Sequence, residues 1–189
     1  MTDWTIVIPV KGTTASKSRF GPGDHRDLAR AMALDTVAAA REVAEVVVVT
    51  VGGAEFSALG ATVVADPGGG LAAAIDAGLA ATAPDRRSAV LLADHPALRA
   101  SELRAALEAA TAHQLAFVAD ADGSGTALIA ARTASLHRHS FGHESRRAHR
   151  RAGYAELTGD WPGLRRDVDT PDHLHDLGLG VHTLAFLRS

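Results

Sequence analysis

Two aspartates near the end of the chain, Asp167 and Asp169, are separated by a single valine in the stretch RRDVDTPDHL, residues 165–174. Residues two apart in an extended chain point to the same side, so both carboxylates face one way and Val168 faces the other. Two carboxylates this close repel each other unless a cation lies between them, and hard divalent cations prefer oxygen ligands. The pattern therefore indicates a site for a cation such as Mg2+.

The same stretch also fits the start of a helix. Thr170 is a favoured N-cap, and Pro171 suits the first helical position. A helix start explains Asp172 well, because acids are favoured there, but it explains Asp167 poorly, since that residue precedes the cap. This stretch alone leaves the metal site and the simple cap as open alternatives.

A third acid, Asp94, ends the apolar run in AVLLADHPAL, residues 89–98. A carboxylate at the end of a buried strand is costly unless it is paired or bound to a metal, although an aspartate that caps the turn before Pro96 is the simpler alternative. Asp94, Asp167 and Asp169 together make three carboxylates. Aspartates around Mg2+ with basic residues nearby are typical of nucleotidyl transfer.

Two loops could bind phosphates. The segment IPVKGTTASKSRF, residues 8–20, carries Lys11, Lys17 and Arg19 among small residues, which suits a polyphosphate, although it matches no Walker A pattern and could be a solvated basic loop. The segment ADPGGG, residues 65–70, carries Asp66 and then three glycines before a helix, so the backbone at Gly69 and Gly70 could approach an anion closely. An ordinary flexible turn is the alternative for the second loop.

Elements that position these residues follow from short apolar runs and alanine-rich segments. We expect strands at 5–10, 46–51, 61–65, 89–93 and 115–119, and helices at 26–41, 71–83 and 101–113. Alternating strands and helices predict an α/β fold with a mostly parallel central sheet flanked by helices, in one domain over residues 1–189. Ligands of such sheets bind beyond the carboxyl ends of the strands, where the candidate residues lie. Glu102 falls in the first turn of a predicted helix, which suits the helix dipole.

The pattern changes after Asp120. Residues 120–132 predict a glycine-bearing loop and then a strand, and residues 136–153 are polar, basic and rich in histidine. This second segment does not look like core, and we interpret it as an insertion over the sheet or a solvated helix. Four histidines could bind a transition metal, but five arginines surround them, which favours a basic lid for an anionic substrate. The histidines are His137, His139, His143 and His149, and the arginines are Arg138, Arg146, Arg147, Arg150 and Arg151.

Amino-acid composition argues against several classes of partner and of catalytic site. Among 189 residues, 19 Lys and Arg against 22 Asp and Glu give a net charge of −3, so we expect no nucleic-acid or membrane-surface partner. The absence of cysteine excludes disulfides, thiolate catalysis and cysteine-ligated metals, and it fits a cytoplasmic location. The N-terminal sequence reads as neither a secretory signal nor a membrane span.

The set of motifs resembles the CofC/FbiD family, the guanylyltransferases that activate 2-phospho-L-lactate or phosphoenolpyruvate in coenzyme F-420 biosynthesis. The motifs are IPVKGTTASKSRF, ADHPAL, GSGTA, SFGHESRRAHRRAG and ELTGDWPGLRRDVDTPDHL. The resemblance runs from about Thr5 to Gly178 in the family's order, and its last motif is the most specific. It implies a nucleotidyltransferase fold of the GT-A type, related to the molybdenum-cofactor (MobA-like) transferases.

The resemblance also implies roles for individual residues. Asp94, Asp167 and Asp169 would be the metal-binding acids for Mg2+ or Mn2+. Thr126, Gly142 and Ser145 would hold the carboxylate of the phospho-acid, partly through backbone amides. Lys11, Lys17 and Arg19 would contact the triphosphate of GTP, with Lys17 and Arg19 also acting on the departing pyrophosphate.

The chain departs from the family at a few positions. Ala93 and His95 stand where Gly and Leu are usual, Ala72 stands where Asn is usual, and His143-Glu144 replaces Pro-Asp. The missing asparagine amide removes a potential nucleotide contact.

We therefore expect an enzyme that transfers GMP from GTP to phosphoenolpyruvate or 2-phospho-L-lactate, acts as a monomer or homodimer, and hands its product to the next transferase of the pathway. Two alternatives stay open. One is a related nucleotidyltransferase acting on another phosphate, such as 3-phosphoglycerate, molybdopterin or a sugar phosphate. The other is a non-catalytic nucleotide-binding protein.

Overall fold

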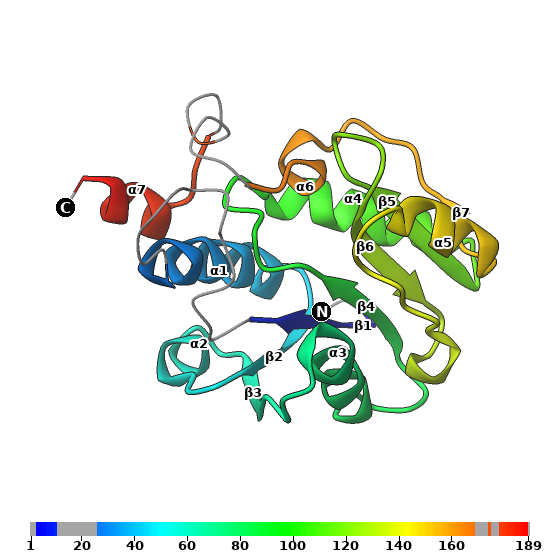
Figure 1. The fold of residues 1–189 in the computed structure, drawn as a ribbon, viewed down its shortest axis with the longest axis horizontal. Helices are drawn as coiled ribbons and strands as arrows, with labels where there is room; N and C mark the ends of the chain where they lie inside the picture. Colours follow the sequence, from blue (N-terminus) through cyan, green and yellow to red (C-terminus); the bar gives the residue numbers. More distant parts are fainter. Residues whose placement is uncertain (1–2, 11–25, 169–173, 175–177, 189) are drawn as a thin grey trace.

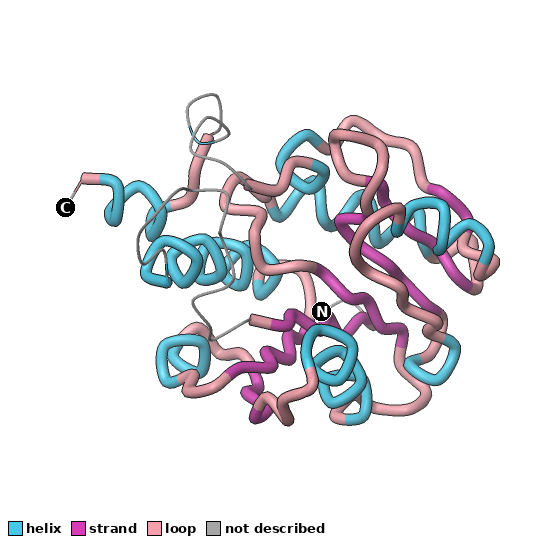
Figure 2. Tube along the Cα trace, in the orientation of Figure 1, coloured by secondary structure: helices cyan, strands magenta, loops and turns pink. Residues whose placement is uncertain are grey.

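A single seven-stranded sheet forms the centre of the molecule, shown as arrows in Figure 1 and in magenta in Figure 2. The computed structural model describes residues 3–10, 26–168, 174 and 178–188. The strands are β1 (Trp4–Pro9), β2 (Glu45–Thr50), β3 (Thr62–Ala65), β4 (Arg87–Leu91), β5 (Leu115–Ala119), β6 (Thr126–Ala131) and β7 (Ala155–Glu156). The helices are α1 (Arg26–Arg41), α2 (Ala54–Ala58), α3 (Gly70–Ala80), α4 (Ala100–Ala110), α5 (Ser145–Arg151), α6 (Pro162–Arg165) and α7 (Val181–Leu187).

Strand order confirms the expected mostly parallel sheet. The order is β3-β2-β1-β4-β6-β5-β7, and every described pairing is parallel except the two made by β6. The chain runs outward from β1 through β2 to β3 and then returns to place β4 on the other side of β1. That reversal of strand order is where open α/β sheets bind ligands, outside the carboxyl ends of the strands.

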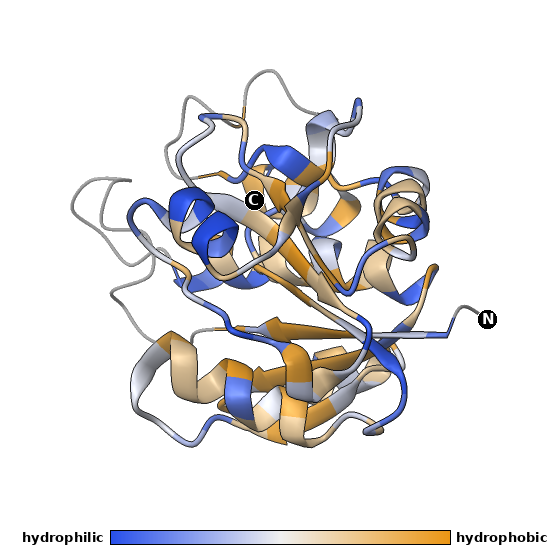
Figure 3. Cartoon of the chain, turned by 90° about the vertical axis from the view of Figure 1, so that its right-hand side faces the viewer, coloured by the Kyte–Doolittle hydropathy of each residue, from blue (hydrophilic) through white to orange (hydrophobic). Residues whose placement is uncertain are grey.

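Alternating side chains divide the core into two layers, one on each face of the sheet. In β1, Ile6 and Ile8 pack toward α1 and α4, whereas Val7 between them packs toward α3. All three side chains are fully buried. A strand buried on both faces reads as a continuous apolar run, which is why β1 was recognisable from its sequence. Figure 3 shows these strands in orange between helices whose outer surfaces carry blue residues.

Two predicted helices end earlier than their alanine-rich segments. The predicted helix 71–83 is observed at Gly70–Ala80, and the predicted helix 101–113 at Ala100–Ala110. In both cases a threonine just beyond the end turns its hydroxyl back onto a carbonyl three residues earlier, as Thr82 does to Leu79 at 2.7 Å and Thr111 does to Glu108 at 2.6 Å. These side-chain bonds compete with continued helix, which apolar periodicity does not register.

The C-terminal helix α7 is held by a buried carboxylate that the sequence did not reveal. Asp35 lies within α1, and its two oxygens accept hydrogen bonds from the backbone N–H groups of His182 at 2.9 Å and Thr183 at 2.8 Å. The Asp35 side chain thus satisfies N–H groups that the start of any helix leaves without an intrahelical partner. A Cβ on Gly180 would lie 2.3 Å from Asp35 Cγ, so this close approach requires glycine.

None of the helices in the described ranges is both long and apolar enough to cross a bilayer.

Replacing Asp35 by alanine should leave the N–H groups of His182 and Thr183 without their acceptor in a largely buried place. We expect Asp35→Ala to lower the free energy of unfolding by about 1–3 kcal/mol, measured by urea denaturation. Asp27→Ala is the matched control, because Asp27 lies on the same helix but is exposed. Equal losses for the two variants would contradict the capping role.

Candidate functional site

The carboxyl-terminal edge of the sheet brings several of the expected residues into one region. Asp66 directly follows β3, and Asp94 lies three residues beyond the end of β4. Because β6 runs antiparallel, it begins at this same edge with Thr126, and Leu92 N donates to Ala127 O at 3.5 Å. The single reversed strand therefore carries Thr126 to the loop that bears Asp94.

A backbone hydrogen bond joins the loop that bears Asp94 to the segment that bears Asp167. Val168 N donates to Asp94 O at 3.0 Å, so the segment containing Asp167 runs beside the loop after β4. The Val168 side chain is fully buried against Leu28 and Met32 of α1, whereas Asp167 and Asp94 are only partly buried. Asp169 lies outside the described residues, as do Thr170 and Pro171, on which the alternative of a helix cap rests.

Carboxylate oxygens, which Asp94 and Asp167 both carry, are ligands that hard divalent cations prefer. Within the described part of the chain, no group of three His, Asp or Glu side chains is arranged to hold a metal ion. The expected set needs Asp169 as its third member. His95, which stands where leucine is usual in the resembling family, is buried beside this set, with Nε2 3.8 Å from Asp94 Oδ1.

The segment that leads into Asp167 is fixed by a second buried carboxylate, Glu102 of α4. Its oxygens accept hydrogen bonds from Gly163 N at 3.3 Å and Leu164 N at 3.0 Å, in the first turn of α6. A Cβ on Gly163 would lie 2.2 Å from Ala97 O, so only glycine fits the glycine position of the WPGLR motif. The sequence suggested only a helix-dipole role for Glu102; the structure shows that it holds another element.

Three consecutive glycines after β3 adopt backbone conformations that other residues rarely use. Gly68, Gly69 and Gly70 have φ angles of +77°, +86° and +86°, and they lead directly into α3. Asp66 stabilises this loop itself, since its Oδ1 accepts Gly68 N at 2.9 Å. The positive φ angles by themselves account for three glycines in a row, independently of phosphate binding. Lys11, Lys17 and Arg19 lie outside the described residues.

The three residues expected to hold a carboxylate lie together. Ser145 N donates to Gly142 O at 3.1 Å, and Ser145 Oγ donates to Thr126 Oγ1 at 3.2 Å. Thr126 and Ser145 are both buried. Glu144, which lies between Gly142 and Ser145 in the sequence, has a positive φ of 58°, a conformation that aspartate tolerates better than glutamate. Glutamate at this position therefore costs more backbone strain than the aspartate usual in the family.

The histidine-rich segment is partly core, which corrects the interpretation that none of it looks like core. His149 is fully buried: its Nδ1 lies 2.9 Å from Thr126 Oγ1, and its Nε2 accepts Ser140 N at 3.0 Å. His137 contacts Ser88 and Tyr154 through its two ring nitrogens. Burial lowers the pKa of both histidines to about 4, so they are neutral at neutral pH. In the structure, the aromatic rings of Phe117, Phe141 and Tyr154 lie against His149, a contact that the polar sequence around this histidine does not indicate.

These ring contacts bear on the alternative of a transition-metal site. His139 Nε2 lies 2.8 Å from Asp76 Oδ1 on α3, away from the partners of His137 and His149. The rings of His137, His139 and His149 thus contact different residues, and within the described part of the chain no three histidine or carboxylate side chains form a metal site.

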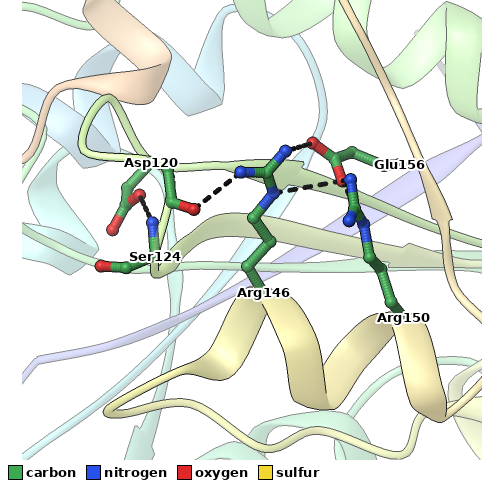
Figure 4. A network of polar contacts seen from close by, with 6 residues as sticks. Asp120, Ser124, Arg146, Arg150 and Glu156 are labelled. Atoms are coloured by element: carbon green, nitrogen blue, oxygen red, sulfur yellow. Dashed lines mark hydrogen bonds and ion pairs between the residues drawn. The ribbon is translucent and has the colours of Figure 1, made fainter.

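The arginines of α5 hold the neighbouring loop and strand in place. Arg146 makes a two-pronged contact with Glu156 of β7 at 3.2 and 2.8 Å and donates to Gly123 O at 2.7 Å, and Arg150 also donates to Glu156 (Figure 4). The loop before Thr126 is further closed by Ser124 N, which donates to Asp120 Oδ1 at 3.1 Å. Burial alone would raise the pKa of Glu156, but the hydrogen bonds from Arg146 and Arg150 outweigh it and hold that pKa below its usual value.

Two departures from the resembling family differ in their structural cost. Ala93 does not have a positive φ, so alanine in place of glycine adds no backbone strain, and its carbonyl accepts a hydrogen bond from Thr36 Oγ1 at 3.3 Å. Ala72 is exposed in the first turn of α3. There the shorter side chain disturbs no packing but offers no amide to a ligand.

A family model and a curated relative both relate this chain to nucleotidyltransferases. A family model described as a MobA-like NTP transferase domain matches residues 28–166. A phosphoenolpyruvate guanylyltransferase of Geodermatophilus obscurus is 44% identical, over 97% of this chain and 94% of that protein.

Solved structures resemble this fold at lower identity. A putative nucleotide-diphospho-sugar transferase from Desulfovibrio desulfuricans superposes with a TM-score of 0.67 at 20% identity, covering 100% of this chain and 95% of the other. A manganese complex of a Mycobacterium tuberculosis protein gives a TM-score of 0.58 at 21% identity, covering 91% and 96%. At these identities the likeness shows the fold alone.

Glu102→Gln should weaken the attachment of α6, because an amide group replaces one of the two oxygens that face backbone N–H groups. We expect the free energy of unfolding to fall by about 1–3 kcal/mol in urea denaturation. Glu108→Gln, on the exposed face of the same helix, is the control and should change stability by less than about 0.5 kcal/mol. A Glu102 variant as stable as the control would show that the buried carboxylate does not hold α6.

The ion pairs of Glu156 should make stability depend on pH in the acidic range. Its pKa is lowered in the folded protein, so the stabilisation is complete above the unfolded pKa of about 4.3 and is lost as pH falls through the lower folded pKa. In Glu156→Gln this contribution is absent. Urea denaturation from about pH 7 down to about pH 3 should therefore show a wild-type advantage that is constant near neutrality and shrinks below about pH 4. An advantage independent of pH would contradict this assignment.

Proposed function

The chain belongs to the phosphoenolpyruvate guanylyltransferase family, whose members carry a MobA-like NTP transferase domain, and we propose that it joins GMP from GTP to phosphoenolpyruvate in coenzyme F-420 biosynthesis. The observation that carries the proposal is the hydrogen bond from Val168 N to Asp94 O. It brings the two distant segments that bear Asp94 and Asp167 together at the carboxyl edge of the sheet, where a nucleotide would bind.

The reaction is a nucleotidyl transfer. A phosphate oxygen of the three-carbon acid forms a bond to the α-phosphorus of GTP, while the bond from that phosphorus to the oxygen of the β-phosphate breaks and its electron pair leaves with pyrophosphate. The attacking oxygen is already ionised at neutral pH, so the reaction needs no general base. The product is GMP joined through a diphosphate link to the acid, either phosphoenolpyruvate or 2-phospho-L-lactate.

Asp94, Asp167 and Asp169 are the residues that would hold Mg2+ or Mn2+. The partly buried carboxylates of Asp94 and Asp167 at the sheet edge support this assignment. When bound, the cation would neutralise charge on the triphosphate and on the transferring phosphate. The backbone bond from Val168 N to Asp94 O would hold the segments that carry these two aspartates next to each other.

Other residues would bind the two substrates. Lys11, Lys17 and Arg19 would bind the triphosphate, and Lys17 and Arg19 would stabilise the departing pyrophosphate. Backbone N–H groups near Gly69 and Gly70 would approach the nucleotide, with Asp66 fixing their loop. Thr126, Gly142 and Ser145 would receive the carboxylate of the acid, and their mutual hydrogen bonds support a common pocket.

The wider setting is part of the same proposal. Residues 1–189 would act as one nucleotidyltransferase domain, in the cytoplasm, with small-molecule substrates only. The product would pass to the next transferase of the pathway. The chain would work as a monomer or a homodimer, which sedimentation in solution would distinguish.

The decisive assay is pyrophosphate release with GTP and Mg2+, with phosphoenolpyruvate, 2-phospho-L-lactate and 3-phosphoglycerate tested in parallel. The next enzyme of the pathway is included to draw off an unstable product. Release with phosphoenolpyruvate supports the proposal, and release with 2-phospho-L-lactate alone changes the acceptor. Release with 3-phosphoglycerate alone moves the chain to the related transferases. A rise in melting temperature with GTP and Mg2+ but no release with any acid would favour a non-catalytic binding protein.

Asp94→Asn and Asp169→Ala should each reduce turnover by at least about 100-fold, because each removes a carboxylate from the proposed metal site. The melting temperature should change little, and the affinity for Mn2+ should fall. Asp160→Asn is the control, since Asp160 is an exposed aspartate outside the proposed site. Either site variant with near-full turnover would remove that aspartate from the metal set.

A further inference from the structure

His149 contacts two different groups through its two ring nitrogens. In the contact with the Ser140 backbone amide, only the amide can be the hydrogen-bond donor. Ser140 N lies 3.0 Å from His149 Nε2. A backbone N–H can only donate, so Nε2 must accept and carries no hydrogen. A neutral imidazole has one N–H, which must therefore be on Nδ1.

The tautomer determines what happens at Thr126. His149 Nδ1 lies 2.9 Å from Thr126 Oγ1, so the ring donates its hydrogen to that hydroxyl oxygen. Ser145 Oγ also donates to the same oxygen, at 3.2 Å. A hydroxyl has two acceptor lone pairs and one hydrogen. Both lone pairs of Thr126 Oγ1 are then occupied, and the Thr126 hydroxyl can act only as a donor.

The surroundings keep His149 neutral and fix its ring. Phe141 and Tyr154 pack edge-on against it, each with ring centroids 5.3 Å away, and Phe117 lies at 6.0 Å. The ring is fully buried, and burial lowers its pKa to about 4. A protonated ring would also place a second N–H against the N–H of Ser140. The neutral form with Nδ1–H is therefore the one that this pocket stabilises.

We propose that His149 is a positioning residue: the Ser140 amide fixes its tautomer, and its Nδ1–H makes the Thr126 hydroxyl an obligate hydrogen-bond donor to the carboxylate of the three-carbon acid. The identity of that acceptor rests on the proposed function. In the opposite tautomer, His149 Nδ1 would accept the hydrogen of the Thr126 hydroxyl, and that hydroxyl could then donate no hydrogen bond to an anion. His149 thus acts on the substrate only through Thr126.

The first test reads the tautomer directly and needs no substrate. Ring nitrogen-15 chemical shifts of the labelled full-length protein distinguish the two tautomers and the cation, and the signals missing from His149→Phe identify this residue. We expect His149 to be neutral near neutral pH, with its hydrogen on Nδ1. A hydrogen on Nε2, or a charged ring, would overturn the proposal.

The second test separates positioning from general structure. His149→Phe keeps an aromatic ring but donates no hydrogen bond, so we expect KM for phosphoenolpyruvate to rise by at least about tenfold while KM for GTP changes by less than about twofold. His149→Asn can still present an N–H toward Thr126 and should recover part of the loss. His137→Phe is the matched control: His137 is a partly buried histidine of the same segment, but it contacts Ser88 and Tyr154. Its KM for phosphoenolpyruvate should stay near that of the wild type.

A double variant tests whether the effect passes through Thr126. In a Thr126→Val background there is no hydroxyl to orient, so adding His149→Phe should raise KM for phosphoenolpyruvate by less than about twofold. Independent, multiplicative effects of the two changes would overturn the proposal, as would equal effects of His149→Phe on both substrates.

Failure of the proposed function gives a different pattern. If wild-type protein releases no pyrophosphate with phosphoenolpyruvate but does so with another acid, the same variants are measured with that acid. If no acid supports release, the carboxylate acceptor is overturned, whatever tautomer the nitrogen shifts report.

Discussion

The site depends on how completely the backbone of the loop after β4 is hydrogen-bonded. Asp94 O accepts Val168 N at 3.0 Å, and Pro96 O accepts Gly180 N at 2.7 Å. Thr36 Oγ1 of α1 bridges the loop by donating to Ala93 O and accepting His95 N. Segments far apart in the sequence therefore converge on four residues, 93–96.

Two buried carboxylates make this convergence possible. Glu102 holds α6 just before Asp167, and Asp35 holds α7 just after Gly180. Each satisfies backbone N–H groups at the start of a short helix, which would be marginal by itself. Periodicity could not reveal these roles, because an acid within a helical segment usually faces solvent. The same limit applies to His149, whose polar sequence neighbours suggested a surface segment. The features that the sequence did predict rest on patterns that recur along the chain. They are the burial of β1 on both faces, the alanine-rich helices, and the polar residues directly after strands.

The reversed strand β6 shows why the sequence could predict the residues of the site more readily than their arrangement. Glycine-bearing residues before Thr126 indicated a loop and then a strand, but strand direction leaves no local pattern. In the structure, β6 lies between β4 and β5 and is antiparallel to both. A parallel strand here would place Thr126 at the opposite edge from Asp94. The pairing of Leu128 with Leu91 instead places the beginning of β6 at the ligand-binding edge.

The two halves of the site differ in how they would treat negative charge. At Asp94 and Asp167 the proposed site would present carboxylates, so an anionic nucleotide would be bound there together with a cation. Around Thr126 and Ser145 the Ser145 hydroxyl donates to Thr126 Oγ1, so the Thr126 hydroxyl would be the neutral donor, and the nearby cations Arg146 and Arg150 are paired with Glu156. Neutral donors are less costly to desolvate than an arginine, and they bind a carboxylate by direction more than by charge. Under the proposal above, recognition of the small acid would depend on the orientation of the Thr126 hydroxyl, which the buried His149 contacts at 2.9 Å.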